Sequence, residues 1–203
     1  MSSITEINSK LPGTKTSIFS VMSKMANDHN AINLSQGFPN FETDQQLKDL
    51  VSKAMNDGYN QYPPDSGVQE LREQISLKIK SLYGKKYDVN SEITVTSGAT
   101  EALYTAITAF VHKGDEVIVL KPAYDTYEPT IKLSGGIPVQ IQLKGENYKV
   151  DWDEVKLAIT SKTKMIIINS PHNPSGTILT ENDMLRLQNI LSDTNIILLS
   201  DEV

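Results

Sequence analysis

The chain has 203 residues, of which 19 are Lys or Arg and 25 are Asp or Glu, so its net charge is −6 at pH 7. This length suits one α/β domain or slightly more, and 38% hydrophobic with 22% charged residues argues against disorder. The acidic balance gives no support to a nucleic-acid-binding surface. No apolar run reaches the roughly 18–20 residues of a membrane span, and the N-terminus lacks the apolar core of a signal peptide. We therefore expect a cytoplasmic protein with no nucleic acid and no membrane as partner.

Cysteine is absent from the sequence. Its absence excludes disulfides, a cysteine nucleophile and thiolate metal sites. The three histidines (His29, His112 and His172) are scattered and show no metal-ligand spacing. The sequence therefore predicts no metal centre.

Two helices are predicted in the N-terminal part of the chain. Residues 1 to about 45 are irregular and turn-rich, except that apolar residues recur at helical spacing between Ile18 and Met25. Apolar residues at 68, 71, 75, 79 and 82 define one face of a second helix. Asp65 or Ser66 is its expected N-cap.

Strands and helices then alternate along the chain. Five β-prone runs predict strands at 93–95, 116–120, 137–143, 165–168 and 196–199. The segments between them predict helices at 101–111, 126–133, 151–159 and 181–191. Asp151 and Thr180 are expected N-caps, and Gly114 is the expected C-cap glycine of the first helix. This pattern predicts a mostly parallel sheet with helices on both faces.

The last predicted strand is apolar throughout and ends four residues before Val203. A buried strand is normally covered by the chain that follows it. We therefore expect these residues to be the front part of a longer protein, the alternative being a short natural C-terminus.

Three predicted strands are followed by unusual polar residues, where ligands bind in open α/β sheets. Small residues at Ser97–Thr100 open a helix, and such a helix start can bind a phosphate. Two prolines fix Asn173 in the segment Asn169–Gly176, and Asp201 is a carboxylate that needs a partner after a buried strand. Each feature alone is compatible with an ordinary turn, but together they suit a cofactor with a phosphate, a phenolic oxygen and a basic ring nitrogen. Pyridoxal 5′-phosphate has all three. The sequence lacks the glycine-rich motifs that are typical of nucleotide-binding loops.

The sequence resembles the class I (fold type I) pyridoxal-phosphate-dependent aminotransferases, most of all the methionine aminotransferase and kynurenine–oxoglutarate aminotransferase group. Six segments carry the resemblance in the family's order: Asn33–Phe41, Asn60–Tyr62, Ile93–Leu103, Pro122–Pro129, Asn169–Gly176 and Ser200–Val203. The resemblance implies the α/β fold of PLP-dependent transferases of fold type I and a homodimer. Residues 1–45 would then be an N-terminal segment of the small domain, and 46–203 the first part of the large PLP-binding domain.

The resemblance also implies cofactor-binding residues. The backbone N–H groups of Ala99 and Thr100 would bind the cofactor's phosphate. Tyr124 would stack on the pyridine ring, and Asp201 would pair with the protonated ring nitrogen. Asn173 would donate to the cofactor's O3′ and lie near the substrate carboxylate.

The resemblance implies roles for two further residues, and it implies that the catalytic lysine is absent from these 203 residues. Gly37 would lie against the substrate, and Tyr62 would reach the phosphate bound by the partner subunit. The family's Schiff-base lysine would lie beyond Val203, so the catalytic lysine is not among these residues. The 203 residues alone are therefore expected to be inactive.

The implied activity of the full-length protein is transfer of an amino group between an L-amino acid, such as methionine or an aromatic one, and a 2-oxo acid. Two alternatives share the same residues. One is cysteine-conjugate β-lyase activity on the same scaffold, and the other is a non-catalytic PLP-binding descendant.

Overall fold

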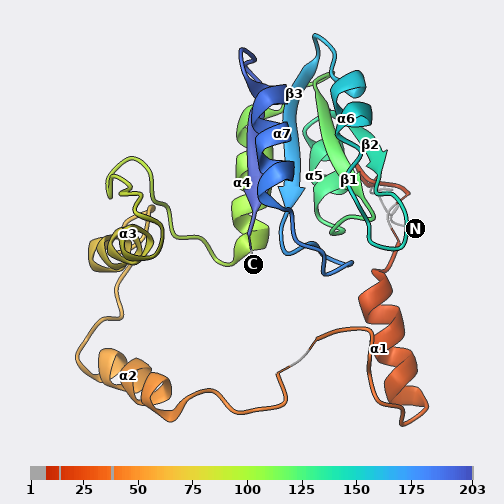
Figure 1. The fold of residues 1–203 in the computed structure, drawn as a ribbon. Coiled ribbons are helices and arrows are strands. Elements are labelled where there is room, and N and C mark those ends of the chain that lie inside the picture. Colours follow the sequence, from red (N-terminus) through yellow and green to blue (C-terminus); the bar gives the residue numbers. More distant parts are fainter. Residues whose placement is uncertain (1–7, 14, 38, 203) are drawn as a thin grey trace, which may run out of the picture. The chain divides into compact units, whose positions relative to one another are not determined.

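A computed structural model of the chain describes residues 8–13, 15–37 and 39–202 (Figure 1). The described residues form seven helices and four strands. They divide into two units, Met1–Lys15 with Gly98–Val203 and Thr16–Ser97. We call the first the sheet unit and the second the helical unit, and describe each by itself.

The sheet unit contains a four-stranded parallel sheet in the order β2-β1-β3-β4. Its strands are β1 (Glu116–Lys121), β2 (Ile137–Gln142), β3 (Thr163–Asn169) and β4 (Ile197–Asp201). The β1–β2 pairing runs to the end of both strands, and the β3–β4 pairing ends at Asn169↔Asp201. The β1–β3 pairing stops earlier, at Val119↔Ile167. The two central strands are therefore unpaired with each other at their carboxyl ends.

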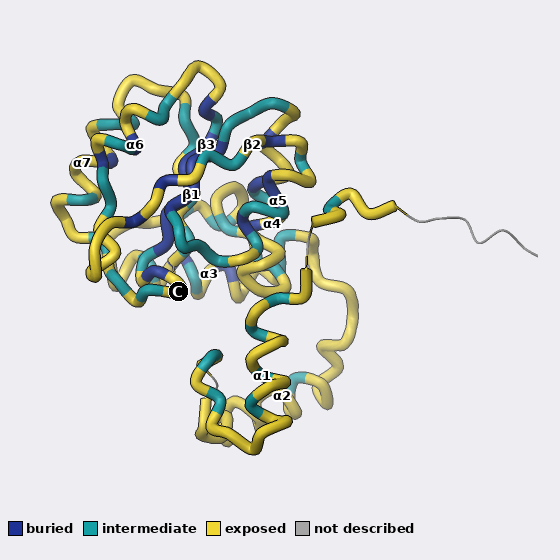
Figure 2. Tube along the Cα trace, turned by 90° about the vertical axis from the view of Figure 1, so that its right-hand side faces the viewer, coloured by how far each residue is buried: buried dark blue, intermediate teal, exposed yellow. Residues whose placement is uncertain are grey.

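Helices cover both faces of this sheet, as Figure 1 shows. Because side chains alternate along a strand, Val117 and Val119 pack on one face, and Ile118 and Leu120 on the other. The first face packs against α4 (Ala99–Phe110) and α5 (Tyr127–Leu133). The second packs against α6 (Trp152–Ala158) and α7 (Glu181–Leu191). Figure 2 shows the buried residues gathered in β1 and β3, so the apolar core forms around the central strands.

Most of the predicted alternation is confirmed, including both N-caps. Asp151 accepts from the N–H groups of Asp153 and Glu154, and Thr180 forms a capping box with Asp183. The prediction for Gly114 is wrong, because α4 ends at Phe110 with Val111 as its C-cap. Gly114 lies in the turn that follows, where its φ is +90° and its N–H donates to the Gly135 carbonyl.

The expectation of five strands is also corrected. Residues 93–95 join no strand ladder among the described residues, and the Val95 N–H instead donates to the Ser66 carbonyl at 3.0 Å. The apolar run 196–199 does form β4, but Leu198 is 39% exposed. It is exposed because β4 is an edge strand of the described sheet, so part of its apolar surface is left uncovered.

The helical unit contains α1 (Ile18–Asp28), α2 (Gln45–Asn56) and α3 (Gln69–Tyr83). The first and third confirm the predicted helices, whereas α2 was not predicted. The expected N-cap of α3 is wrong. Gly67, with φ +92°, forms a turn in which its N–H donates to the Pro64 carbonyl, so the helix starts only after Val68. Figure 2 shows that α1 and α2 are mostly exposed, and neither contains a buried residue.

Each helix within residues 8–13, 15–37 and 39–202 is too short or too polar to span a bilayer.

Candidate functional site

The carboxyl ends of β1 and β3 mark the candidate site. From β1 the chain passes to β2 on one side of the sheet, and from β3 it passes to β4 on the other. Ligands of open α/β sheets bind where the strand order reverses in this way. The β1–β3 pairing stops at Val119↔Ile167, two residues before either strand ends. The loops that follow these adjacent strands therefore begin next to each other at the carboxyl edge of the sheet.

The structure places four of the predicted site elements in the sheet unit. Tyr124 lies in the loop after β1, and Asn173 lies in the loop after β3. Asp201 is the last residue of β4, and Ala99 and Thr100 begin α4. Asn173 and the start of α4 are exposed, whereas Tyr124 and Asp201 are half-buried.

A continuous series of contacts joins the start of α4 to the end of β4. The Thr100 Oγ1 lies 3.4 Å from the Tyr124 hydroxyl. The Tyr124 ring meets the Tyr127 ring edge-on, with centroids 5.8 Å apart. The Tyr127 hydroxyl then donates to Asp201 Oδ2 at 2.5 Å. These contacts bring together three of the residues predicted from sequence and add a fourth, Tyr127.

Tyr127 has no predicted site role in the sequence, and its burial keeps the hydroxyl in the protonated, donating form. Its side chain is only 2% exposed. Burial, together with the hydrogen bond and the negative charge of Asp201, raises the pKa of Tyr127 well above its ordinary value. The hydroxyl therefore stays protonated and holds one oxygen of Asp201 in place. One indication of this role was available in the sequence, because Tyr127 lies within Pro122–Pro129, one of the segments that resemble the family.

A second network ties the Asn173 loop to Asp201. The buried Asn169 side chain donates to the Asp201 carbonyl at 2.8 Å, and the Ser170 N–H donates to the same carbonyl at 3.2 Å. The Asn169 side-chain oxygen accepts from the Asn173 N–H at 2.5 Å. Asn169 thus fixes the backbone of Asn173 relative to Asp201, a role that the sequence analysis missed.

The start of α4 has the geometry of a helix that can receive an anion. Gly98 is the N-cap with φ +86° and ψ 164°, a backbone conformation adopted almost only by glycine. A Cβ added to Gly98 would meet no atom within 4 Å, so the space beside it is open. The first-turn N–H groups of Ala99 and Thr100 have no intrahelical carbonyl as partner. Such N–H groups and the helix dipole favour a negative group at this end.

The two remaining predicted residues lie in the helical unit. Tyr62 is 98% exposed, and a Cβ added to Gly37 would meet no atom within 4 Å. The roles of both residues stay predictions.

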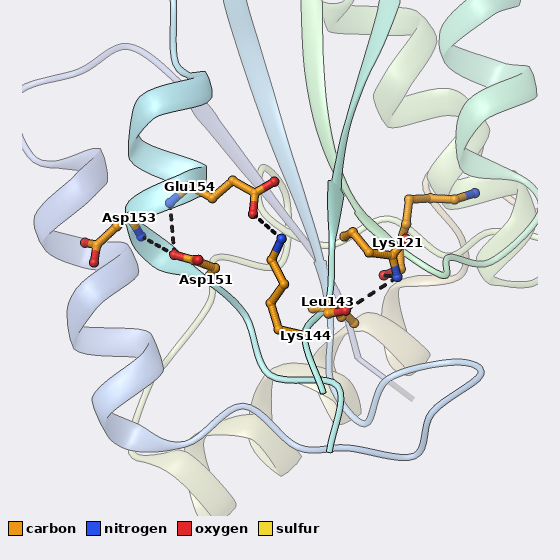
Figure 3. A network of polar contacts seen from close by, with 7 residues as sticks. Lys121, Leu143, Lys144, Asp151, Asp153 and Glu154 are labelled. Atoms are coloured by element: carbon orange, nitrogen blue, oxygen red, sulfur yellow. Dashed lines mark hydrogen bonds and ion pairs between the residues drawn. The ribbon is translucent and has the colours of Figure 1, made fainter. Parts of the chain in front are cut away.

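Two lysines lie near the carboxyl ends of β1 and β2, and both pair with carboxylates. Lys121 is the last residue of β1, and Lys144 follows β2. Lys121 Nζ lies 2.6 Å from Glu128, and Lys144 Nζ lies 2.7 Å from Glu154. Figure 3 shows the Lys144–Glu154 pair beside the Asp151 cap. The Leu143 N–H donates to the Lys121 carbonyl at 2.8 Å. The Glu154 hydrogen bond raises the pKa of Lys144. A lysine nucleophile must lose its proton, so paired ammonium groups are poor candidates for that role.

Comparison with known proteins identifies the family. The family model for aminotransferase class I and II matches residues 29–203. The chain belongs to this family. It is 48% identical to the methionine aminotransferase of Escherichia coli over 96% of its length, and 35% identical to the kynurenine–oxoglutarate transaminase of Dictyostelium discoideum over 92%. The family and the fold class inferred from the sequence are thereby confirmed.

Solved structures agree with this assignment. The Escherichia coli protein YbdL, identified as a methionine aminotransferase, superposes with a TM-score of 0.94 at 47% identity over 98% of this chain. The N-succinyldiaminopimelate aminotransferase of Mycobacterium tuberculosis superposes with a TM-score of 0.90 at 34% identity over 96%. The match covers 52% and 51% of those chains, respectively. The aminotransferase chain thus spans about half the length of the curated relatives it matches.

Proposed function

We propose that the full-length protein is a pyridoxal-phosphate-dependent aminotransferase, EC 2.6.1.-, that moves an amino group between an L-amino acid and a 2-oxo acid. Methionine or an aromatic amino acid is the proposed donor, by analogy with the relatives named above. The observation that carries the proposal is the series of contacts from Thr100 through Tyr124 and Tyr127 to Asp201 at the sheet's switch point.

The residues present fit the chemistry of this cofactor. A phosphate needs N–H donors at a helix start, which Ala99 and Thr100 would supply behind an unobstructed Gly98. A protonated pyridine nitrogen needs a carboxylate, and Asp201 is a half-buried carboxylate oriented by Tyr127. A phenolic oxygen needs a donor, and the side-chain amide of Asn173 follows the neighbouring strand. An aromatic ring needs a flat partner, which Tyr124 would provide.

In the proposed mechanism each of these residues holds a group in position. When bound, pyridoxal phosphate supplies an electron sink for the Cα–H bond that is broken. Asp201 keeps the proton on the ring nitrogen, because a nearby negative charge favours the charged form of its partner. The Tyr127 hydroxyl fixes the Asp201 carboxylate, and Asn173 orients both the phenolic oxygen and the substrate carboxylate.

Other parts of the proposal concern residues outside the sheet unit and the intact protein. Gly37 would lie against the substrate, and Tyr62 would reach the phosphate in the partner subunit of a cytoplasmic homodimer. Residues 1–45 would belong to the small domain and 46–203 to the large one. The catalytic lysine would lie beyond Val203, so borohydride should fix the cofactor there. Fixation to Lys121 or Lys164 would contradict the proposal.

The deciding experiment is Asp201→Asn in the full-length protein, which removes the charge and keeps the shape. Single-turnover kinetics with methionine or an aromatic amino acid should show a loss of ~10²–10⁴ in the proton-transfer step, equivalent to ~3–5 kcal/mol. Cofactor affinity should fall far less, because the phosphate-binding residues are unchanged. Asp193→Asn is the matched control, since Asp193 is exposed and Asn tolerates its positive φ. A loss of less than threefold in Asp201→Asn, with cofactor bound, would refute the role of this carboxylate.

A further inference from the structure

The loop after β3 forms a tight turn around Asn173, and backbone hydrogen bonds close that turn. The His172 N–H donates to the Thr177 carbonyl at 2.8 Å, and the Gly176 N–H donates to the His172 carbonyl at 2.7 Å. Gly176 has a φ of +73°, a conformation that costs glycine little. These two bonds fold residues 172–177 back on themselves, but neither of them involves a side chain or Asn173 itself.

A side chain of the turn, that of Ser175, bonds to residues at both of its ends. The Ser175 Oγ lies 2.7 Å from His172 Nδ1 and 2.8 Å from Thr177 Oγ1, and it accepts from the Thr177 N–H at 3.3 Å. A hydroxyl has one proton to donate and two lone pairs that accept. The three contacts therefore use the full hydrogen-bonding capacity of Ser175.

His172 gives this arrangement a fixed point. It is only 7% exposed, whereas Ser175 and Thr177 are half-buried. Protein interiors are close-packed, so a buried ring cannot change its position without disturbing its neighbours. The bond from the ring to Ser175 spans Asn173 and Pro174, which stand between the two residues in the chain. Asn173 thus lies within a short closed segment that is anchored by a buried ring.

Asn173 is also attached on its other side, to the end of β3. Its N–H donates to the side-chain oxygen of Asn169 at 2.5 Å. One bond to a backbone N–H fixes the position of that group but leaves the rest of the turn free to pivot about it. The contacts of Ser175 supply a second attachment. Together the two attachments set the direction in which the Asn173 side chain leaves the backbone.

We propose that Ser175 is a positioning residue, which holds the Asn173 side chain toward the cofactor's phenolic oxygen through its bonds to His172 and Thr177. The proposal rests on the proposed function, since Asn173 has that role only if pyridoxal phosphate binds. Ser175 need not touch the cofactor or the substrate. Its contribution is to order the turn before they arrive, which lowers the cost of ordering Asn173 on binding.

Four substitutions test this role. Ser175→Ala removes the hydroxyl, and Ser175→Thr keeps it and adds one methyl group at a half-buried position. Thr177→Val keeps the shape of Thr177 but removes the Oγ1 that contacts Ser175. Ser192→Ala is the matched control, because the hydroxyl of the exposed Ser192 donates to the Gln188 carbonyl at the end of α7.

The first measurement is hydrogen–deuterium exchange of the full-length protein without cofactor. The amides of residues 172–177 should lose about 3- to 10-fold of their protection in Ser175→Ala, as expected for lost neutral hydrogen bonds. Ser175→Thr and the control should stay within about twofold of the parent. Thr177→Val should lose about 2- to 5-fold, and it should add nothing to Ser175→Ala, because the contact between the two hydroxyls is then already lost.

The second measurement is the pH at which the absorbance of bound pyridoxal phosphate changes in the full-length protein. A donor to the phenolic oxygen stabilises its anion, so Asn173→Ala should raise this midpoint. Ser175→Ala should raise it by about 0.3–1 pH unit, and Ser175→Thr should restore the parent value. Ser175→Ala should add little to Asn173→Ala, because it acts through the same side chain. A role of Ser175 in stability alone would leave the midpoint unchanged.

The two measurements separate failure of this proposal from failure of the proposed function. Unchanged protection in Ser175→Ala, or additive effects of Ser175→Ala and Thr177→Val, would overturn the assigned contacts. A parent-like absorbance midpoint in Ser175→Ala would overturn the positioning role, even if protection is lost. A parent that binds no pyridoxal phosphate would refute the proposed function, and with it the role of Asn173, whereas the exchange result would still report on Ser175. If Ser175→Thr does not fold, the results with Ser175→Ala decide by themselves.

Discussion

The hydrogen bond between Tyr127 and Asp201 gives the most direct test of the site. Tyr127→Phe removes the hydroxyl and keeps the ring, so the edge-on contact with Tyr124 remains. A hydrogen bond to a charged acceptor contributes about 1.5–3 kcal/mol to stability. Tyr127 is 2% exposed but Asp201 is half-buried, so water can partly replace the lost donor. We therefore expect a loss of about 1.5 kcal/mol in the free energy of unfolding.

A double-mutant cycle in urea measures this interaction in the full-length protein without cofactor. Combining Tyr127→Phe with Asp201→Ala should give a coupling energy of about 1.5–3 kcal/mol. The control cycle combines Tyr124→Phe with Thr100→Val. Those hydroxyls are 3.4 Å apart and Thr100 is exposed, so their coupling should stay below about 0.5 kcal/mol. A Tyr127–Asp201 coupling no larger than that of the control would refute the assigned bond.

Three further results are expected from the same protein. Folding raises the pKa of Tyr127, so this residue contributes stability that is complete below about pH 10 and is lost as pH rises further. The parent protein should therefore lose stability above about pH 10, and Tyr127→Phe should not show this loss. Gly98→Ala should lower the free energy of unfolding by about 1–3 kcal/mol and weaken phosphate binding, because its backbone conformation strains any other residue. Gly37→Ala should change the free energy of unfolding by less than about 0.5 kcal/mol, because Gly37 has open space beside it and no positive φ. Burial raises the pKa of Asp183, but hydrogen bonds from Thr180 and Trp152 outweigh this effect and hold the pKa below its usual value. The parent should therefore be more stable than Asp183→Asn near neutral pH, and this difference should disappear as pH falls through the lowered pKa.

Local patterns were enough to predict most of the sheet unit. The apolar run at Met165–Ile168 and the caps Asp151 and Thr180 depend on neighbouring residues only, and all appear where expected. The helix α2 shows the limit of such reading. Its apolar residues Leu47, Leu50 and Val51 have helical spacing, yet no helix was predicted there.

Predictions that depended on partners distant in the sequence were less reliable. Residues 93–95 have the composition of a strand, but a strand forms only where another pairs with it. The alternation of strands and helices did predict that the polar residues at the ends of β3 and β4 lie at one edge of the sheet, because parallel strands bring their carboxyl ends to the same edge.

The sequence by itself therefore determined the family, the alternation of elements and the residue types at the site. Tertiary structure alone decided which groups meet there. Tyr127 and Asp201 are 74 residues apart, and their bond depends on α5 packing against the sheet face to which β4 contributes Ile197 and Leu199. Hydrogen bonds act over about 3 Å, and only the packed fold sets distances between remote residues on that scale.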